Sequence, residues 1–444
     1  MRGRRKEGTV GAVARIENPD WARRMNLAVP GAGCPTQERL NPSLSTKFVR
    51  RMLDLSRLRD QLDSFEEYEA EVRDRRSEQQ RRARAALRAC AEQWTEVQAA
   101  VEAAEPRRLV AALRESPAVA TSAPERPTPI TVVATDGSQI YPDRHVDPMF
   151  FLLNVSQVGF QYGTREEPLL DAEPRLRFED DLSAHVDEAL GSMTTELVSA
   201  MRDEMELERL LEAARTAQVN ERPLVALADG TLIRWMIRGM NNEAVEEQLI
   251  ARYTEYLQTF QRDGLPLASY VSMPATTEVV NLLRFVVGEL DAPAPEGIDV
   301  TPQEPPLDGL LDRHVFDAVL DPGERSATFG STSHIQRSYP TGSEVHYFYL
   351  KVPARAGPGE MSRVEVPKWV AEDATLLDHI HATILRECEK GEGYPLALSE
   401  AHERAVIRAS EREAFFRLME RRLRRAGLSP TDSRKRRSKQ APRV

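Results

Sequence analysis

Apolar positions divide the chain into a helical N-terminal part and a longer part in which strands and helices alternate. Between Ser43 and Arg114, apolar residues recur at spacings of three and four, on both sides of a charged stretch, EEYEAEVRDRRSEQQRRARAA. Two apolar stripes joined by such a stretch predict a helical hairpin or short coiled coil, which we place at residues 46–115. A scaffold or dimerisation element is the ordinary interpretation of this arm. Direct contact of its arginines with nucleic acid is the alternative.

Residues 115–129 are rich in Pro, Ala and Ser and mark a domain boundary. The pattern beyond them predicts strands at Ile130–Thr135, Leu224–Ala228 and Leu267–Ser272, with helices between them. Further helices are expected at Glu188–Ala217, 240–262, Thr276–Leu290, 372–390 and 399–426, and further strands at Val345–Val352 and Arg363–Val366. Strands interleaved with helices predict an α/β domain with a mixed sheet over residues 128–420.

Charge is unevenly distributed over the 444 residues, which carry a formal net charge of −10. Residues 1–45 form a basic segment without apolar periodicity, and we expect it to be irregular. Residues 427–444 are expected to form a disordered basic tail, which contains the cluster Arg434, Lys435, Arg436 and Arg437. One interpretation is a solvated chain end. The other is a mobile arm that binds the phosphates of a nucleic acid, because clustered cations release counterions from a polyanion.

Several protein classes do not fit this sequence. No apolar run approaches the ~18 residues of a membrane span, and no apolar stretch follows the basic start as in a secretory signal. Three scattered cysteines, Cys34, Cys90 and Cys388, cannot form a disulfide framework. We therefore expect a soluble cytoplasmic protein. No G-x-x-x-x-G-K-[ST] pattern occurs, so any ATP-driven step would need a separate partner.

Two predicted strands end in the same way, VVATDGS at Asp136 and VALADGT at Asp229. Ligand sites of α/β sheets assemble at the carboxyl ends of strands, and a glycine there allows close approach of backbone. If the two strands are neighbours, the paired carboxylates favour a cation between them, and oxygen ligands favour Mg²⁺ or Mn²⁺. The alternative is that Asp-Gly is turn chemistry alone. Candidates for a third acid lie on the preceding helix: Glu196, Glu204, Glu206, Glu208 and Glu212.

Five segments in this order resemble the NurA family of DNA-repair nucleases: TDGSQIYPDRH, LADGTLI, HYFYLKV, SRVEVPKWV and GYPLALSEAHERAVI. The resemblance covers about residues 128–420. It implies an RNase H-like fold, cleavage of DNA with Mn²⁺ or Mg²⁺, and work with a hexameric HerA-like ATPase that translocates DNA. It also implies a homodimer.

The resemblance assigns metal ligands to three positions. Asp136 and Asp229 match the two metal aspartates of the family. The family's glutamate lies in a pattern R-x-x-x-E, which Arg202 to Glu206 fits best, with Glu208 as the second choice.

Other positions of the family's site also have matches. His402 matches the C-terminal histidine, which could orient a scissile phosphate or activate water, and Tyr347 or Tyr349 matches the aromatic residue of a strand motif. Asp312 and Arg313 match an acidic-basic pair to which we assign no role.

The function implied is metal-assisted hydrolysis of DNA. We expect a 5′-3′ exonuclease with some endonuclease activity on single strands, which resects DNA ends in double-strand break repair. One alternative is a catalytically weak DNA-end adaptor that loads or regulates a hexameric translocase. Another is a different activity on the same fold, such as a phosphatase or a transposase-like enzyme.

Overall fold

The computed structural model describes residues 58–104, 106–142, 149–178, 195–218, 222–237, 243–290, 305–355, 357 and 359–427. The chain divides into two compact units, Met1–Ser64 and Phe65–Val444, and the sheet and the candidate site belong to the second. The predictions for residues 1–45 and for the tail from residue 428 on lie outside the described residues. Among the described residues, no helix is long and apolar enough to cross a membrane.

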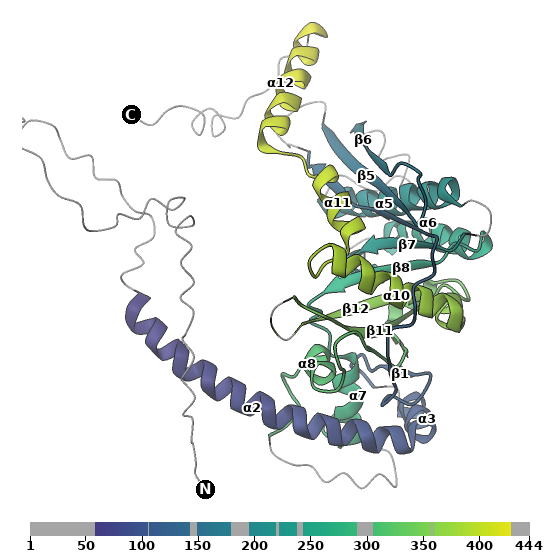
Figure 1. Ribbon diagram of the computed structural model, residues 1–444. Helices are drawn as coiled ribbons and strands as arrows, with labels where there is room; N and C mark the ends of the chain where they lie inside the picture. The colour runs from purple at the N-terminus through teal and green to yellow at the C-terminus, as the bar shows by residue number, and fades with distance from the viewer. Residues whose placement is uncertain are drawn as a thin grey trace, which may run out of the picture. The chain divides into compact units, whose positions relative to one another are not determined.

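The described strands form one mixed sheet, shown in Figure 1. Strand β3 (Ile130–Thr135) pairs antiparallel with β5 (Phe150–Tyr162), which pairs antiparallel with β6 (Leu169–Phe178) and β4 (Gly137–Ile140). On its other side β3 pairs in parallel with β7 (Leu224–Asp229). Strand β7 in turn pairs in parallel with β8 (Leu267–Ser272). Because β3 and β7 run in the same direction, their carboxyl ends lie at one edge of the sheet.

The sheet continues beyond β8 with antiparallel strands. Strand β12 (Glu360–Pro367) pairs with β8 and with β11 (Val345–Val352). Short strands complete this side: β1 (Ala112–Leu113), β2 (Ala120–Thr121), β9 (Arg325–Ser326) and β10 (Phe329–Gly330).

Helices cover both faces because the central strands are apolar on both. Val133 of β3 packs with α5 (Thr195–Ala217) and α6 (Glu243–Arg262). Val132 and Ala134 point to the opposite face, where α10 (Ala374–Lys390) and α11 (Leu396–Ala405) lie, as in Figure 1. Alternation along a strand therefore sends successive side chains to different helices.

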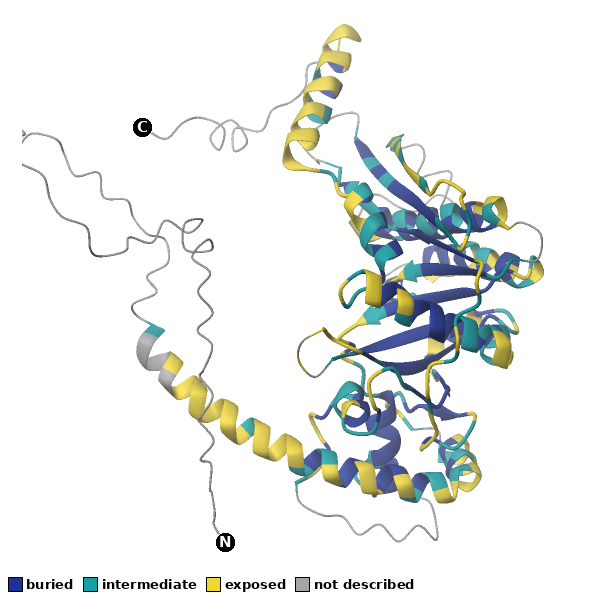
Figure 2. Ribbon diagram, viewed as in Figure 1, coloured by how far each residue is buried: buried dark blue, intermediate teal, exposed yellow. Residues whose placement is uncertain are grey.

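The remaining helical segments flank or connect these elements. They are α2 (Arg59–Glu92), α3 (Trp94–Ala104), η2 (Trp235–Ile237), α7 (Glu278–Val286), α8 (Asp312–Asp317), η3 (His334–Ser338), α9 (Lys368–Ala371) and α12 (Ala409–Arg425). Figure 2 shows the central strands as buried and much of α2 as exposed.

The α/β class with a mixed sheet and flanking helices, expected from the sequence, is confirmed. Two helices differ from their predicted bounds. The charged stretch expected to join two helical stripes continues one 34-residue helix, α2, because it contains good helix formers and no glycine or proline. The helix predicted at 399–426 is broken between α11 and α12, where Val406 and Arg408 have extended backbone.

Candidate active site

The two Asp-Gly motifs meet at one edge of the sheet. Thr135 at the end of β3 lies opposite Ala228 of β7, and the next residues of the two strands are Asp136 and Asp229. Neighbouring strands lie about 4.8 Å apart, so the two aspartates leave the sheet side by side. Each carboxylate also accepts a hydrogen bond from the backbone N–H of the glycine that follows it, at 2.7 Å for Asp136 and 2.9 Å for Asp229.

His402 lies against the first aspartate. Its Nδ1 is 2.8 Å from Oδ2 of Asp136, and its side chain is 63% exposed whereas that of Asp136 is 15% exposed. The bond uses Nδ1, so the other ring nitrogen, Nε2, is the one that can reach a substrate. The structure thus brings together two residues that are 266 positions apart in the chain.

Three polar side chains hold the helix of His402 in place. Asn154 and Ser138 both donate to the carbonyl oxygen of Ala405, the former at 2.8 Å. Ser156 donates to the carbonyl oxygen of Ala401 at 2.8 Å. These carbonyls belong to the last turn and a half of α11, which helical hydrogen bonds leave partly unsatisfied. The bonds therefore fix the end of α11 that carries His402 against strands β4 and β5.

Glu206 reaches the site from the opposite face of the sheet. The hydroxyl of Thr135 donates to its backbone oxygen at 3.0 Å, which ties α5 to the end of β3. The helix can approach because residue 137 is glycine: a Cβ there would collide with Oε1 of Glu206 and lie 2.9 Å from Cγ of Arg202. The backbone φ of Gly137 is not positive, so the requirement is for space and not for conformation.

The Glu206 carboxylate is paired with Arg202. Nε of Arg202 lies 2.9 Å from its Oε1, and the Glu206 side chain is only 16% exposed. Burial raises the pKa of Glu206 to about 8. The charges of Asp203 and Asp136 add to this rise in its pKa, while Arg202 opposes it. Arg234 opposes the rise as well, so two acids and two arginines surround this carboxyl and burial is the largest cause of its raised pKa.

The second aspartate has a partner that the motifs did not single out. The hydroxyl of Tyr394 donates to Oδ1 of Asp229 at 2.8 Å. Burial raises the pKa of Asp229, and the Tyr394 hydrogen bond opposes that rise. Tyr394 lies within the segment GYPLALSEAHERAVI, eight residues before His402, so its position in that segment was the available signal.

These residues suit a hard divalent cation by their chemistry. Asp136, Glu206 and Asp229 offer only oxygen, the ligand that Mg²⁺ and Mn²⁺ prefer. Oε1 of Glu206 is buried and, apart from its ion pair with Arg202, has no hydrogen-bond partner in the described part of the chain. Within that part, no three His, Cys, Asp or Glu side chains converge closely enough to form a finished metal site. The oxygen-only donor set therefore fits a divalent cation, and in this structure Arg202 is the cation paired with Glu206.

Other residues expected at the site lie elsewhere. Tyr347 is fully buried on β11, where the guanidinium of Arg363 lies 3.5 Å from the centre of its ring. Tyr349 donates to Oδ2 of buried Asp312 at 2.7 Å, in the same core. Neither tyrosine is brought to the carboxylates. Glu208, the second choice for the glutamate, pairs with Arg175 at 2.9 Å on the outer face of α5. The Arg434, Lys435, Arg436 and Arg437 cluster lies outside the described residues.

The strand order defines a class of protein. Strands β3, β5 and β6 form an antiparallel meander, and β7 and β8 extend it in parallel with β3. Helices α5 and α6 are the crossover connections. This is the RNase H-like arrangement of an α/β sheet. The acids stand at the end of its first strand, on its first crossover helix and at the end of its fourth strand. The family model described as the NurA domain matches residues 130–407, and the chain belongs to this family.

Three solved structures that match this chain share little sequence with it. The NurA nuclease from Sulfolobus solfataricus is 13% identical, with 69% of this chain and 88% of that chain covered and a TM-score of 0.44. A second NurA structure is 14% identical, with 67% and 90% covered and a TM-score of 0.33. The type 1 RNase H LC9-RNase H1 is 13% identical, with 38% and 78% covered and a TM-score of 0.19. A search of the curated proteins gives no match.

Proposed function

We propose that the protein is a divalent-metal-dependent deoxyribonuclease that hydrolyses phosphodiester bonds at the edge of the sheet between α5 and α11. The observation that carries this proposal is that Asp136 and Asp229 end neighbouring parallel strands, with His402 against Asp136 and helix α5, which carries Glu206, bonded to the end of β3. Membership of the NurA family supports it.

Asp136, Glu206 and Asp229 would hold Mn²⁺ or Mg²⁺. When bound, such an ion supplies a Lewis acid that polarises a phosphoryl oxygen and lowers the pKa of water. The protein's own contribution is to bring three acids to one edge of the sheet. The backbone N–H of Gly230 and the Tyr394 hydroxyl donate to Asp229 and oppose the rise in its pKa that burial causes.

His402 would act on the substrate. Asp136 orients its ring through Nδ1, so Nε2 can donate to the scissile phosphate or pass a proton to or from it. Asp136 would thus contact both His402 and the cation, and it would orient the histidine ring relative to the ion.

The family resemblance supports a more detailed proposal. It describes a 5′-3′ exonuclease with some endonuclease activity on single strands, which resects ends in double-strand break repair with a HerA-like hexameric ATPase and works as a homodimer. Because the sequence contains no G-x-x-x-x-G-K-[ST] pattern, the scheme assigns the ATP-driven step to a separate motor.

Cleavage of end-labelled linear DNA in Mn²⁺ tests the proposal. We expect the wild type to shorten the DNA, EDTA to abolish the reaction, and Asp136→Asn to lower the rate by at least about a hundredfold, as removal of one central electrostatic group does in other enzymes. Asp321→Asn, an exposed acid outside the site, is the matched control and should cleave like the wild type.

A second readout separates a folding defect from a loss of chemistry. Mn²⁺ should raise the unfolding temperature of the wild type and of Asp321→Asn, but not that of Asp136→Asn, since ligands that bind only the folded state stabilise it. A folded wild type that cuts no DNA, alone or with a HerA-like ATPase, would contradict the nuclease and favour the DNA-end adaptor.

A further inference from the structure

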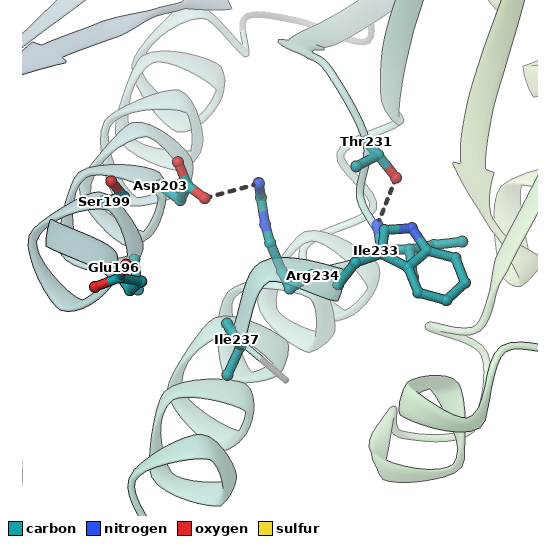
Figure 3. A pocket seen from close by; sticks show the side chains of 9 residues that line it. Glu196, Ser199, Asp203, Thr231, Ile233, Arg234 and Ile237 are labelled. Atoms are coloured by element: carbon teal, nitrogen blue, oxygen red, sulfur yellow. Dashed lines mark hydrogen bonds and ion pairs between the residues drawn. The ribbon is translucent and has the colours of Figure 1, made fainter. Parts of the chain in front are cut away.

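A pocket opens beside the candidate site, between α5 and the segment after β7 (Figure 3). Ala200, Ile233 and Ile237 give it apolar walls, and Trp235 lines it with a side chain that is 41% exposed. Polar groups stand around these walls: Glu196, Ser199, Asp203, Thr231 and Arg234. An apolar cleft with a few polar groups is the ordinary form of a small-molecule or base-binding site.

The pocket adjoins the carboxylates along two elements. Thr231 lies two residues after Asp229, so their Cα atoms are at most about 7.6 Å apart. On α5, Asp203 precedes Glu206 by three residues, a rise of about 4.5 Å along the helix. If a DNA strand binds with one phosphate at the carboxylates, the neighbouring nucleotide is therefore within reach of this pocket.

Hydrogen bonds hold the wall formed by residues 231–234 in place. The Thr231 hydroxyl and the Leu232 backbone N–H both donate to Oε2 of Glu365, each at 2.8 Å. The hydroxyl of Tyr339 donates to the carbonyl oxygen of Leu232 at 2.8 Å, and the backbone N–H of Arg234 donates to that hydroxyl at 3.2 Å. The wall is thus preformed, which lowers the entropic cost of binding.

The charges of the pocket argue against a phosphate as its occupant. Arg234 is paired with Asp203 at 3.1 Å, as Figure 3 shows, and lies over the ring of Tyr253 at 4.4 Å. Its charge is therefore already compensated, and Glu196 adds a further acid to the lining. A neutral, flat group with N–H donors suits an aromatic wall beside polar oxygens, which include the Ser199 and Thr231 hydroxyls. A nucleobase has these properties, since every base has a π-face and all four carry N–H groups.

We propose that this pocket binds a nucleobase next to the scissile phosphate, with Trp235 as the surface on which the base stacks. The inference rests on the proposed nuclease function and specifies its substrate: a base in the pocket has left the stack of a duplex. Because unstacking and unpairing a base are costly in a duplex and cheap in a frayed or single-stranded end, the pocket favours ends of that kind.

Tryptophan fluorescence tests this proposal directly. The full chain contains four tryptophans, and the Asp136→Asn background prevents cleavage during the titration. We expect a short single-stranded oligonucleotide to quench the fluorescence of the Asp136→Asn protein, and Trp235→Phe in this background to remove most of that quenching while keeping the affinity. Trp235→Ala should weaken binding by about tenfold, the lower part of the range for loss of one stacked base. Trp369→Phe is the control and should leave both affinity and quenching by DNA in place.

The substrate provides a second comparison. We expect an oligonucleotide with abasic sites next to the cleavage position to bind the Asp136→Asn protein about tenfold more weakly than intact DNA does. Trp235→Ala in the same background should bind this abasic oligonucleotide as tightly as the Asp136→Asn protein does. In the otherwise wild-type enzyme, Trp235→Ala should raise the KM for a single-stranded substrate more than it lowers kcat.

Two failures are distinguishable. If DNA is bound and cut normally but Trp235→Ala has wild-type affinity, or if abasic DNA binds Asp136→Asn as tightly as intact DNA, the base pocket is wrong and the nuclease stands. If the wild type neither binds nor cuts DNA, the nuclease proposal fails, and the base pocket fails with it.

Discussion

Among single residues, two tyrosines differ in what they do for the fold and for Asp229. Tyr394 donates to Asp229, whereas Tyr347 carries a buried hydroxyl with no hydrogen-bond partner among the described residues. The Tyr394 hydroxyl stabilises the negative charge of Asp229, whereas burial of the Tyr347 hydroxyl costs desolvation energy that no hydrogen bond offsets. The two residues look alike in the sequence, and their surroundings give them opposite roles.

Removal of each hydroxyl should therefore have a different effect. Tyr394→Phe deletes a hydrogen bond to a carboxylate and further raises the pKa of Asp229. We expect a fall in cleavage rate of about tenfold, equivalent to ~1.4 kcal/mol, and a higher Mn²⁺ concentration for half-maximal rate. Tyr347→Phe should change the rate less than twofold (about the noise of such assays). Rates measured across an Mn²⁺ series check both, and equal effects of the two substitutions would argue against Tyr394 as the functional tyrosine.

At the scale of elements, the site depends on how closely helix α5 approaches the turn after β3. Gly137→Ala adds a methyl group that meets the end of the Glu206 side chain and Cγ of Arg202. The end of the Glu206 side chain can move, but Cγ of Arg202 lies close to the helix backbone, so we expect the free energy of unfolding to fall by about 1–3 kcal/mol. The displaced carboxylate should cost about a hundredfold in cleavage rate, because a shift of ~1 Å in a catalytic group has effects of that order.

A glycine away from the site gives the comparison. Gly330→Ala in β10 places a Cβ 3.3 Å from Nε of Arg114, again a flexible side chain, and should alter neither cleavage nor Mn²⁺ binding. Denaturant unfolding and cleavage rates, measured on both variants, separate stability from position. A Gly137→Ala enzyme with the wild-type rate would show that Glu206 does not act from its present place.

The sequence predicted the elements better than the contacts between them. Strands β3, β7 and β8 were recognisable because β-branched and apolar runs stop at polar turns, a signal carried by each segment alone. The break after α11 was missed because Val406 and Arg408 are not helix breakers, and only the turn toward α12 requires their extended backbone. The bond from Tyr394 to Asp229 spans 165 positions and has no local signal. His402 was identified through the family resemblance, since one helical histidine has no distinctive spacing.

Across the molecule, a network of buried ionisable groups connects helix α7 to the wall of the pocket. Arg363 of β12 is 2% exposed and pairs with Glu278 of α7 and Glu365 of β12, each at 2.8 Å. Glu365 in turn accepts the hydrogen bonds of Thr231 and Leu232 in the pocket wall. One fully buried guanidinium thus connects α7 to the loop that lines the base pocket. Loss of one partner would leave a buried charge unpaired, so this network couples the stability of the fold to the shape of the pocket.

Buried histidines should also make the stability of the fold depend on pH. His381 is fully buried, its Nε2 lies 3.0 Å from the carbonyl oxygen of Gly323, and burial lowers its pKa from 6.5 to about 4. Between these values the unfolded chain binds a proton that the folded protein does not. The free energy of unfolding contributed by His381 is therefore complete above pH 6.5 and is lost as the pH falls toward 4, by about 2 kcal/mol at pH 5.

Buried carboxyls with raised pKa values, such as Glu278, act in the opposite direction, so the wild-type curve alone is not diagnostic. The difference between wild type and His381→Gln isolates the histidine: in urea unfolding from pH 8 to pH 4.5 the advantage of the wild type should shrink as the pH falls. A difference that stays constant over this range would mean that His381 is not held neutral in the folded protein.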